Sequence, residues 1–114
     1  MSAVTAVVLD RRQLRDACLD DLDLMRELVA SLIDDTTQQL LALQAAVEKA
    51  DSAECKRVAH YVKGACANLG AEAMAAALRS MEQHAVQGDF AACRSTMATL
   101  PSELQKLRAE ATSL

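Results

Sequence analysis

The sequence predicts an all-α protein, and three observations support that prediction. Hydrophobic residues make up 52% of the 114 residues, whereas aromatic residues make up only 2%. Helix breakers are scarce, with 3 Gly and 1 Pro. Apolar residues recur at spacings of three and four, which is the period of one helix face. These features are typical of helices around one Ala-, Leu- and Met-rich core, and the length suits a single domain over residues 1–114.

The first part of the chain predicts a lead-in, a short helix and a long helix. In the lead-in at residues 2–9, the apolar run 7–9 is expected to pack over one end of the domain. Asp10 is a suitable N-cap for a short helix at residues 11–18. The pair Asp20-Asp21 offers a second N-cap, and a long helix is expected directly after it, at residues 22–49.

The next helix is expected at residues 52–68 and carries the most unusual segment of the chain. Asp51 is its expected N-cap, and Glu54 at the third helical position makes this start resemble a capping box. Gly70 suits the left-handed residue that ends a helix.

Two more helices are expected after this turn. One spans residues 72–87, and Gly88-Asp89 then combines a helix end with an N-cap. The last begins at Phe90, and its apolar stripe keeps phase across Pro101 as far as Leu114. We therefore predict one kinked helix here rather than two. The four long helices are expected to form an antiparallel up-down bundle, with the short helix as an extra lid. Their narrow apolar stripes would all be buried in one core, which favours a monomer.

Composition excludes several classes of function. A net charge of −4 and a pI near 5.1 argue against a nucleic-acid partner, and one Tyr and one Phe provide no stacking platform for bases. Residues 1–9 lack the basic start and apolar length of a signal peptide, and no run approaches the ~18 apolar residues of a membrane span. Four scattered cysteines without a C-x-x-C pair read as reduced core residues. The expected location is the cytoplasm.

His60 is the candidate functional residue, because the helical period places it nearly opposite the core. With Val62 at the middle of the buried stripe, His60 falls ~160° away around the helix. The residues around it are cationic or nearly lack a side chain: Lys56, Arg57, Lys63, Gly64 and Ala67. A glycine inside a helix costs ~1 kcal/mol relative to Ala, so Gly64 indicates close approach by another molecule.

The antiparallel neighbour is expected to bring a polar side chain to this histidine. Folding the chain back at Gly70 places residue 60 level with about residue 80, so Glu82 or Gln83 approaches the imidazole edge. The alternative is an exposed Glu82 that pairs with Arg79 or Arg57. The other histidine, His84, lacks a Lys-Gly neighbourhood and is interpreted as a structural or surface residue.

The segment His60-Tyr61-Val62-Lys63-Gly64, followed by Leu69-Gly70-Ala71 and Met81-Glu82, resembles the histidine phosphotransfer (HPt) domain family. The family pattern is roughly H-x-L-K-G…L-G-A…L-E, and the resemblance extends over nearly the whole chain. Val62 replaces the commoner Leu, and Ala65-Cys66 replaces a Ser-rich pair. The resemblance implies a four-helix bundle whose exposed histidine relays a phosphoryl group between receiver domains.

The resemblance also implies roles for individual residues. His60 is the expected phosphoacceptor, with Lys63 attracting phosphoryl oxygens and Gly64 admitting the partner. Glu82 corresponds to the family position whose carboxylate or amide accepts the Nδ1 hydrogen, which leaves Nε2 as the nucleophile. Gln83, Arg57, Lys56 and Ala67 are supporting residues.

The implied protein is a phosphocarrier without independent catalytic activity. Its expected partners are receiver domains of response regulators, with a hybrid sensor histidine kinase as a further partner. No cofactor or metal is expected on this chain, because the metal ion needed for transfer belongs to the receiver. The main alternative is a helical adaptor that binds receivers or kinases without carrying phosphate. A metal-binding bundle using His60 and Glu82 is a weaker one, since no Glu-x-x-His pair occurs on an apolar face.

Overall fold

Aspartate side chains begin four of the five helices in the computed structural model, which describes residues 6–114 and contains no strand within them. The helices are α1 (Arg11–Ala17), α2 (Leu22–Glu48), α3 (Ser52–Asn68), α4 (Glu72–Val86) and α5 (Phe90–Ala111). Residues 2–5 of the predicted lead-in lie outside the described range. The predicted all-α class is confirmed.

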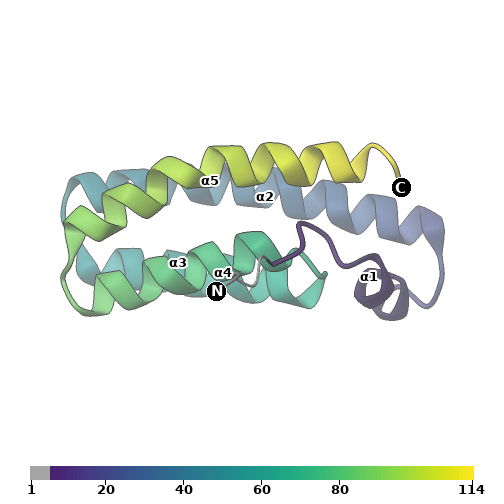
Figure 1. Ribbon diagram of the computed structural model, residues 1–114, viewed down its shortest axis with the longest axis horizontal. Helices are drawn as coiled ribbons and strands as arrows, with labels where there is room; N and C mark the ends of the chain where they lie inside the picture. The colour runs from purple at the N-terminus through teal and green to yellow at the C-terminus, as the bar shows by residue number, and fades with distance from the viewer. Residues whose placement is uncertain (1–5) are drawn as a thin grey trace, which may run out of the picture.

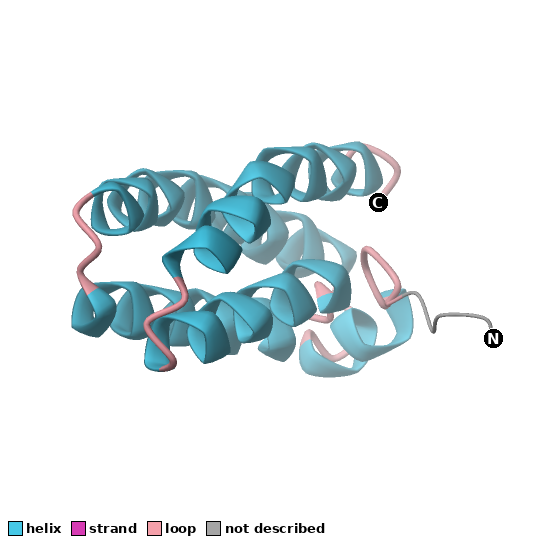
Figure 2. Cartoon of the chain, turned by 60° about the vertical axis from the view of Figure 1, so that its left-hand side comes forward, coloured by secondary structure: helices cyan, strands magenta, loops and turns pink. Residues whose placement is uncertain are grey.

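Helices α2 to α5 form a closed bundle. Contacts join α2 to α3, α3 to α4, α4 to α5 and α5 back to α2. Successive helices run in opposite directions and are joined by short turns, as Figure 1 shows. Figure 2, turned by 60°, shows the four helices enclosing one interior, with α1 at one end. Each helix therefore needs only one apolar face, which matches the narrow stripes of the sequence.

The predicted N-caps share one geometry. In each case the aspartate Oδ1 accepts a hydrogen bond from the backbone amide three residues later, at 3.0–3.1 Å, as seen for Asp10, Asp21, Asp51 and Asp89. Such a bond satisfies one of the amides that a helix start leaves without a partner. The expected capping box is only half formed. Glu54 pairs with Arg57 instead of returning to Asp51, whose own amide donates to the Ala46 carbonyl.

The predicted helix ends need small corrections. Cys18, Lys49 and Gln87 were expected to be the last helical residues, but each is the residue after the end of its helix. Their amides still bond back to the helix, while the chain already turns at the next residue. That residue has a positive φ of 52° at Leu19, 53° at Ala50 and 69° at Gly88.

Helix α5 is continuous through Pro101 and ends at Ala111. Its apolar stripe explains the continuity, because Met97, Leu100 and Leu104 on either side of the proline are all buried. Burial of these side chains offsets the hydrogen bond that proline lacks. The expected single helix is confirmed, and its kink stays a prediction.

The core contains most of the apolar positions that the helical period predicted, whereas Ala65 and Leu69 of the α3 stripe are only partly buried. The α3 stripe is buried at Cys55, Val58, Ala59, Val62 and Cys66. All four cysteines are buried and have free thiols. Burial raises the pKa of both the Cys55 and the Cys66 thiol to about 11, so these groups stay protonated and act as small core residues.

The lead-in holds the turn between α3 and α4. The Asp10 amide donates to the Gly70 carbonyl at 2.8 Å, and the Ala73 amide donates to the Val7 carbonyl at 2.9 Å. The second bond substitutes for a side-chain cap, which α4 lacks. Gly70 has φ +85°, and a Cβ there would lie 2.7 Å from the Asp10 carbonyl oxygen. The turn therefore requires glycine.

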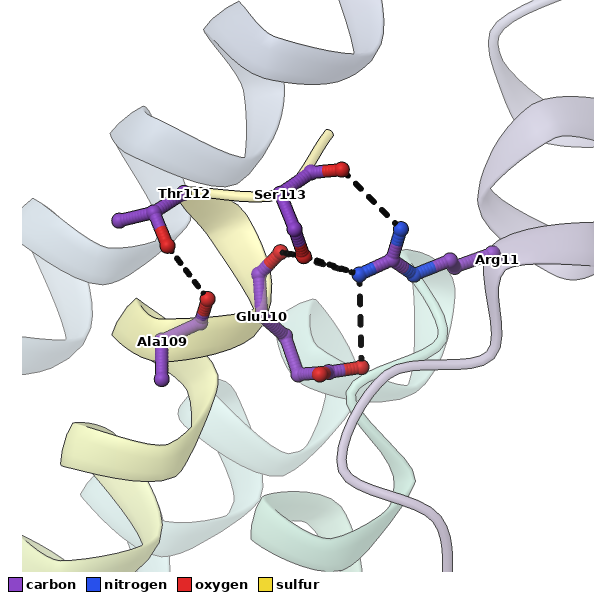
Figure 3. A network of polar contacts seen from close by, with 5 residues as sticks. All are labelled: Arg11, Ala109, Glu110, Thr112 and Ser113. Carbon is purple, nitrogen blue, oxygen red and sulfur yellow. Dashed lines mark hydrogen bonds and ion pairs between the residues drawn. The ribbon is translucent and has the colours of Figure 1, made fainter.

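Helix α1 is attached to the end of α5 through one arginine (Figure 3). The Arg11 guanidinium donates to the carbonyl oxygens of Glu110 and Ser113 and to the Ser113 hydroxyl, and it pairs with the Glu110 carboxylate at 3.6 Å. A cation at a helix C-terminus also interacts favourably with the helix dipole. The expected position of α1 as a lid on the bundle follows from this contact and from the buried Leu14.

Candidate functional site

His60 lies on the outer surface of α3, and 68% of its side chain is exposed. Its neighbours on the opposite face, Val58 and Val62, are almost completely buried. The helical period thus places the imidazole in solvent, while the opposite face of the same helix packs in the core. This is the position that the sequence pattern predicted.

Glu82 of α4 contacts the imidazole. Its Oε2 lies 3.1 Å from His60 Nδ1, and its Oε1 accepts a hydrogen bond of 2.7 Å from the Lys63 ammonium. One carboxylate therefore joins two residues of α3 that lie one helical turn apart. The alternative in which Glu82 pairs with Arg79 or Arg57 does not occur, and Arg57 pairs with Glu54 instead.

The charge of Glu82 determines which imidazole nitrogen carries the hydrogen. The hydrogen bond from Lys63 is the largest cause that lowers the pKa of the Glu82 carboxyl below its ordinary value of 4.5, and His60 contributes in the same direction. The group is therefore ionised at neutral pH and accepts hydrogen bonds without donating them. His60 Nδ1 must then be the donor. In the neutral ring this leaves the Nε2 lone pair free and directed away from α4.

The approach to His60 is open along α3. A Cβ placed on Gly64 would meet no atom within 4 Å. Ala67 is also exposed, and its carbonyl accepts a hydrogen bond from the Gln13 side chain of α1. The surface one and two turns beyond His60 therefore carries almost no side-chain bulk, in keeping with the close approach that Gly64 indicated.

Three of the supporting residues, Lys56, Arg57 and Gln83, line two depressions that both include Glu82. A depression of about 320 Å³ is lined by Ala53, Lys56, Arg57, His60 and Glu82. A second, of about 390 Å³, includes Lys63, Arg79 and Gln83. Lys56 and Arg57 thus line the same depression as the imidazole, whereas Gln83 lines the other one and makes no hydrogen bond to the ring.

Tyr61, the residue after His60 on α3, contacts Asp35 of α2, and the sequence reasoning selected neither residue. The Tyr61 hydroxyl donates to Asp35 Oδ2 of α2 at 2.8 Å. The available signal was the only tyrosine of the chain, placed directly beside the candidate histidine. Asp35 had no such signal, because its distance from residue 61 in the sequence conceals their contact.

Residues 6–114 contain no group of three or more His, Cys, Asp or Glu side chains arranged to hold a metal ion. Within the same range, no helix has the length and apolar character needed to cross a bilayer.

Fold and site together define a class: a four-helix bundle with a solvent-exposed histidine whose ring contacts a carboxylate of the neighbouring helix. The sequence model of the Hpt domain matches residues 27–110. The chain belongs to the Hpt domain family and is a histidine phosphotransfer protein of a phosphorelay. The match includes the segment from His60 to Gly64 as well as Glu82.

The fold agrees with a solved member of the class. The chain is similar to the crystal structure of histidine-containing phosphotransfer protein B (HptB) from Pseudomonas aeruginosa PAO1. The two share 24% sequence identity with a TM-score of 0.86, and the similarity covers 95% of this chain and 94% of that one. At this identity the comparison establishes the fold. A search of curated proteins gave no match.

Proposed function

We propose that His60 is the phosphoacceptor and that it carries the phosphoryl group on Nε2 between the receiver domains of two partner proteins. The observation that carries this proposal is the contact between His60 Nδ1 and the ionised Glu82 carboxylate. It supports one tautomer of an exposed ring, with the nucleophilic lone pair directed outward. His84 lies in the last turn of α4 and has no such partner among the described residues.

The proposed reaction moves a phosphoryl group from an aspartyl phosphate of the donor receiver to the imidazole of His60. The Nε2 lone pair attacks the phosphorus of an aspartyl phosphate on the donor receiver. A P–N bond forms, the P–O bond to the aspartate breaks, and its electron pair leaves with the carboxylate. Nδ1 keeps its hydrogen throughout, and this N–H group stays hydrogen-bonded to the Glu82 carboxylate. The phosphoimidazolium ring is therefore stabilised by a neighbouring anion. The reverse step on a second receiver restores the neutral imidazole.

Lys63 and Gly64 support this step in different ways. The Lys63 ammonium uses one of its three N–H groups on Glu82 and retains two for an arriving phosphoryl oxygen. Gly64 leaves free the space in which the partner must bring phosphorus within bonding distance of Nε2. Lys56 and Arg57 add positive charge around the ring and favour an anionic group there.

This role makes the chain a carrier without independent catalytic activity. We place its partners among receiver domains and a hybrid sensor kinase, and we assign it to the cytoplasm as a monomer. Four buried free thiols support a reducing compartment. Apolar helix faces that are used up in one core support the monomer.

The test is phosphorylation by a phosphorylated receiver domain, followed as acid-labile phosphate on the intact protein. His60→Gln should accept none, while His84→Gln, the matched control, should accept as much as the wild type. NMR of the labelled product should locate phosphorus on Nε2. Label that persists in His60→Gln contradicts the assignment. Receiver binding without any labelling of the wild type would instead establish the adaptor role.

A further inference from the structure

Tyr61 is the only tyrosine of the chain, and it is half exposed beside His60. A surface tyrosine would usually move freely, but the hydroxyl of this one is bound to Asp35 on α2. His60 therefore has two different flanks. On the α4 side lies the polar contact with Glu82, and on the α2 side lies an aromatic ring held in place.

An apolar groove lies along the α2–α3 boundary and begins at Asp35, the hydrogen-bond partner of this ring. The groove has a volume of about 370 Å³, and its walls include Leu28 and Leu32 from α2 and Ala65 and Leu69 from α3. Asp35 forms part of its rim. Ala65 and Leu69 follow Tyr61 at steps of four residues, so the three side chains lie along the same side of α3.

A partner that reacts with His60 is expected to cover the Tyr61 flank as well, because protein interfaces are large. A stable interface covers about 800 Å² on each protein, far more than one imidazole, so a receiver that reacts with His60 must also cover the adjacent residue. The surface around the imidazole offers Lys56 and Arg57, which suit an anionic phosphorylation site. The α2 flank offers an immobilised aromatic ring and an apolar groove, which suit apolar side chains. Tyrosine is one of the residues that most often dominates binding energy at interfaces.

We propose that Tyr61, held by Asp35, determines which receivers dock productively, by packing against an apolar patch that lies beside the receiver's phosphorylated aspartate. The proposal rests on the assignment of His60 as phosphoacceptor. Fixing the ring before docking lowers the ordering cost of the complex. Receivers with a polar side chain at the matching position leave the ring poorly packed and are discriminated against.

The test compares Tyr61 variants with two kinds of phosphodonor. A panel of phosphorylated receiver domains requires docking, whereas phosphoramidate transfers its phosphoryl group to His60 with release of ammonia and requires none. Tyr61→Ala should raise KM for the preferred receiver about tenfold to a hundredfold with a smaller change in kcat, in the range of interface hot spots. The rate with phosphoramidate should stay unchanged. Leu19→Ala, which removes a side chain that is 88% exposed in the turn after α1, is the matched control.

The hydrogen bond is tested separately from the ring. Tyr61→Phe and Asp35→Ala each remove the hydrogen bond but keep the ring. Each should therefore raise KM for the preferred receiver by a few-fold. The double variant should raise this KM no further than either single variant does. Asp35→Asn retains an acceptor and should behave like the wild type. Binding of each receiver to the same variants in a His60→Gln background should weaken in parallel, because docking does not require the reactive ring.

Each outcome bears on one proposal. Unchanged KM values for Tyr61→Ala across the receiver panel overturn the docking role of Tyr61 while leaving the phosphoacceptor in place. An equal fall in the phosphoramidate rate also overturns it, because the ring would then act on His60 itself. Sedimentation that shows a dimer lost in Tyr61→Ala, with receiver transfer unaffected, assigns the groove to a second copy of the chain. Wild-type protein that takes label from neither donor contradicts the proposed function itself.

Discussion

Glu82 Oε2 lies 3.1 Å from His60 Nδ1, and this contact across α3 and α4 connects the fold to the proposed chemistry. Neither residue adopts its place independently. The antiparallel packing of α3 on α4 makes residues 60 and 82 level, and the hydrogen bond from the Lys63 ammonium lowers the pKa of the carboxyl and so stabilises its ionised form. The bundle thereby selects the hydrogen position on an imidazole that is otherwise open to solvent.

The first prediction concerns the tautomer of His60. Glu82→Ala removes the acceptor for Nδ1–H, so the ring should populate both tautomers and phosphoryl transfer should slow by roughly tenfold to a hundredfold, as for other residues that orient a reactive imidazole. Glu82→Gln keeps an acceptor oxygen and should retain most of the Nδ1–H tautomer. Nitrogen NMR of the His60 ring in both variants measures the populations. A ring that stays fully Nδ1-protonated in Glu82→Ala would show that Glu82 has no orienting role.

The second prediction is a pH dependence of stability at the same carboxylate. The pKa of Glu82 is lowered in the folded protein relative to 4.5, chiefly by the hydrogen bond from Lys63. A lowered folded-state pKa means that the unfolded chain binds the proton more tightly. The resulting stabilisation is fully present above the unfolded value near 4.5 and is lost as the pH falls through the lower folded value.

Urea unfolding from pH 7 to pH 3 measures this dependence. The difference in free energy of unfolding between wild type and Glu82→Gln should shrink below about pH 4.5, which is the unfolded-state value. Glu54→Gln provides a comparison, since Glu54 is paired with Arg57 in a more exposed position and should contribute less. A constant difference across this range would mean that the Lys63 contact does not stabilise the charged form.

The third prediction separates folding from docking at Gly64. Gly64→Ala should stabilise the protein by up to about 1 kcal/mol, because alanine is the better helix former and its Cβ meets no atom. Gly64→Gln should slow transfer from a receiver, since a longer side chain occupies the approach to His60, while transfer from phosphoramidate stays unchanged. Thermal unfolding and the two transfer assays give the measurements. Wild-type transfer from receivers by Gly64→Gln would show that this space is not needed.

The fourth prediction concerns Gly70, whose backbone and surroundings both exclude a side chain. Gly70→Ala places a Cβ 2.7 Å from the Asp10 carbonyl and keeps a positive φ, so it should destabilise the protein by about 2–4 kcal/mol. Gly88→Ala is the matched control. It has a similar φ of +69° but no atom within 4 Å of the added Cβ, so it should cost only about 1–2 kcal/mol. Equal losses in the two variants would rule out the contact with Asp10 as a source of destabilisation.

The sequence by itself determined the elements and the exposed position of His60. Both depend on local rules: apolar residues at spacings of three and four define the buried face, and aspartates before four of the five helices satisfy helix-start amides. The same period places His60 opposite Val62 without reference to any other helix. Errors at this level lay at helix termini. At Cys18 and Lys49 the choice between a last helical residue and a cap depends on the turn that follows, and the capping box expected at Asp51 is only half formed.

Only the tertiary structure decided which distant side chains meet. Sequence reasoning placed Glu82 and Gln83 equally near His60, and the rotation of α4 brings Glu82 to Nδ1 and turns Gln83 into another depression. The packing of the helices also brings Tyr61 to Asp35, and it brings the Lys63 ammonium to the Glu82 carboxylate, so that the charge of Lys63 is paired. The physical reason is that a helical period specifies which face is buried, whereas the register and rotation of packed helices arise from the interlocking of side chains across the whole core.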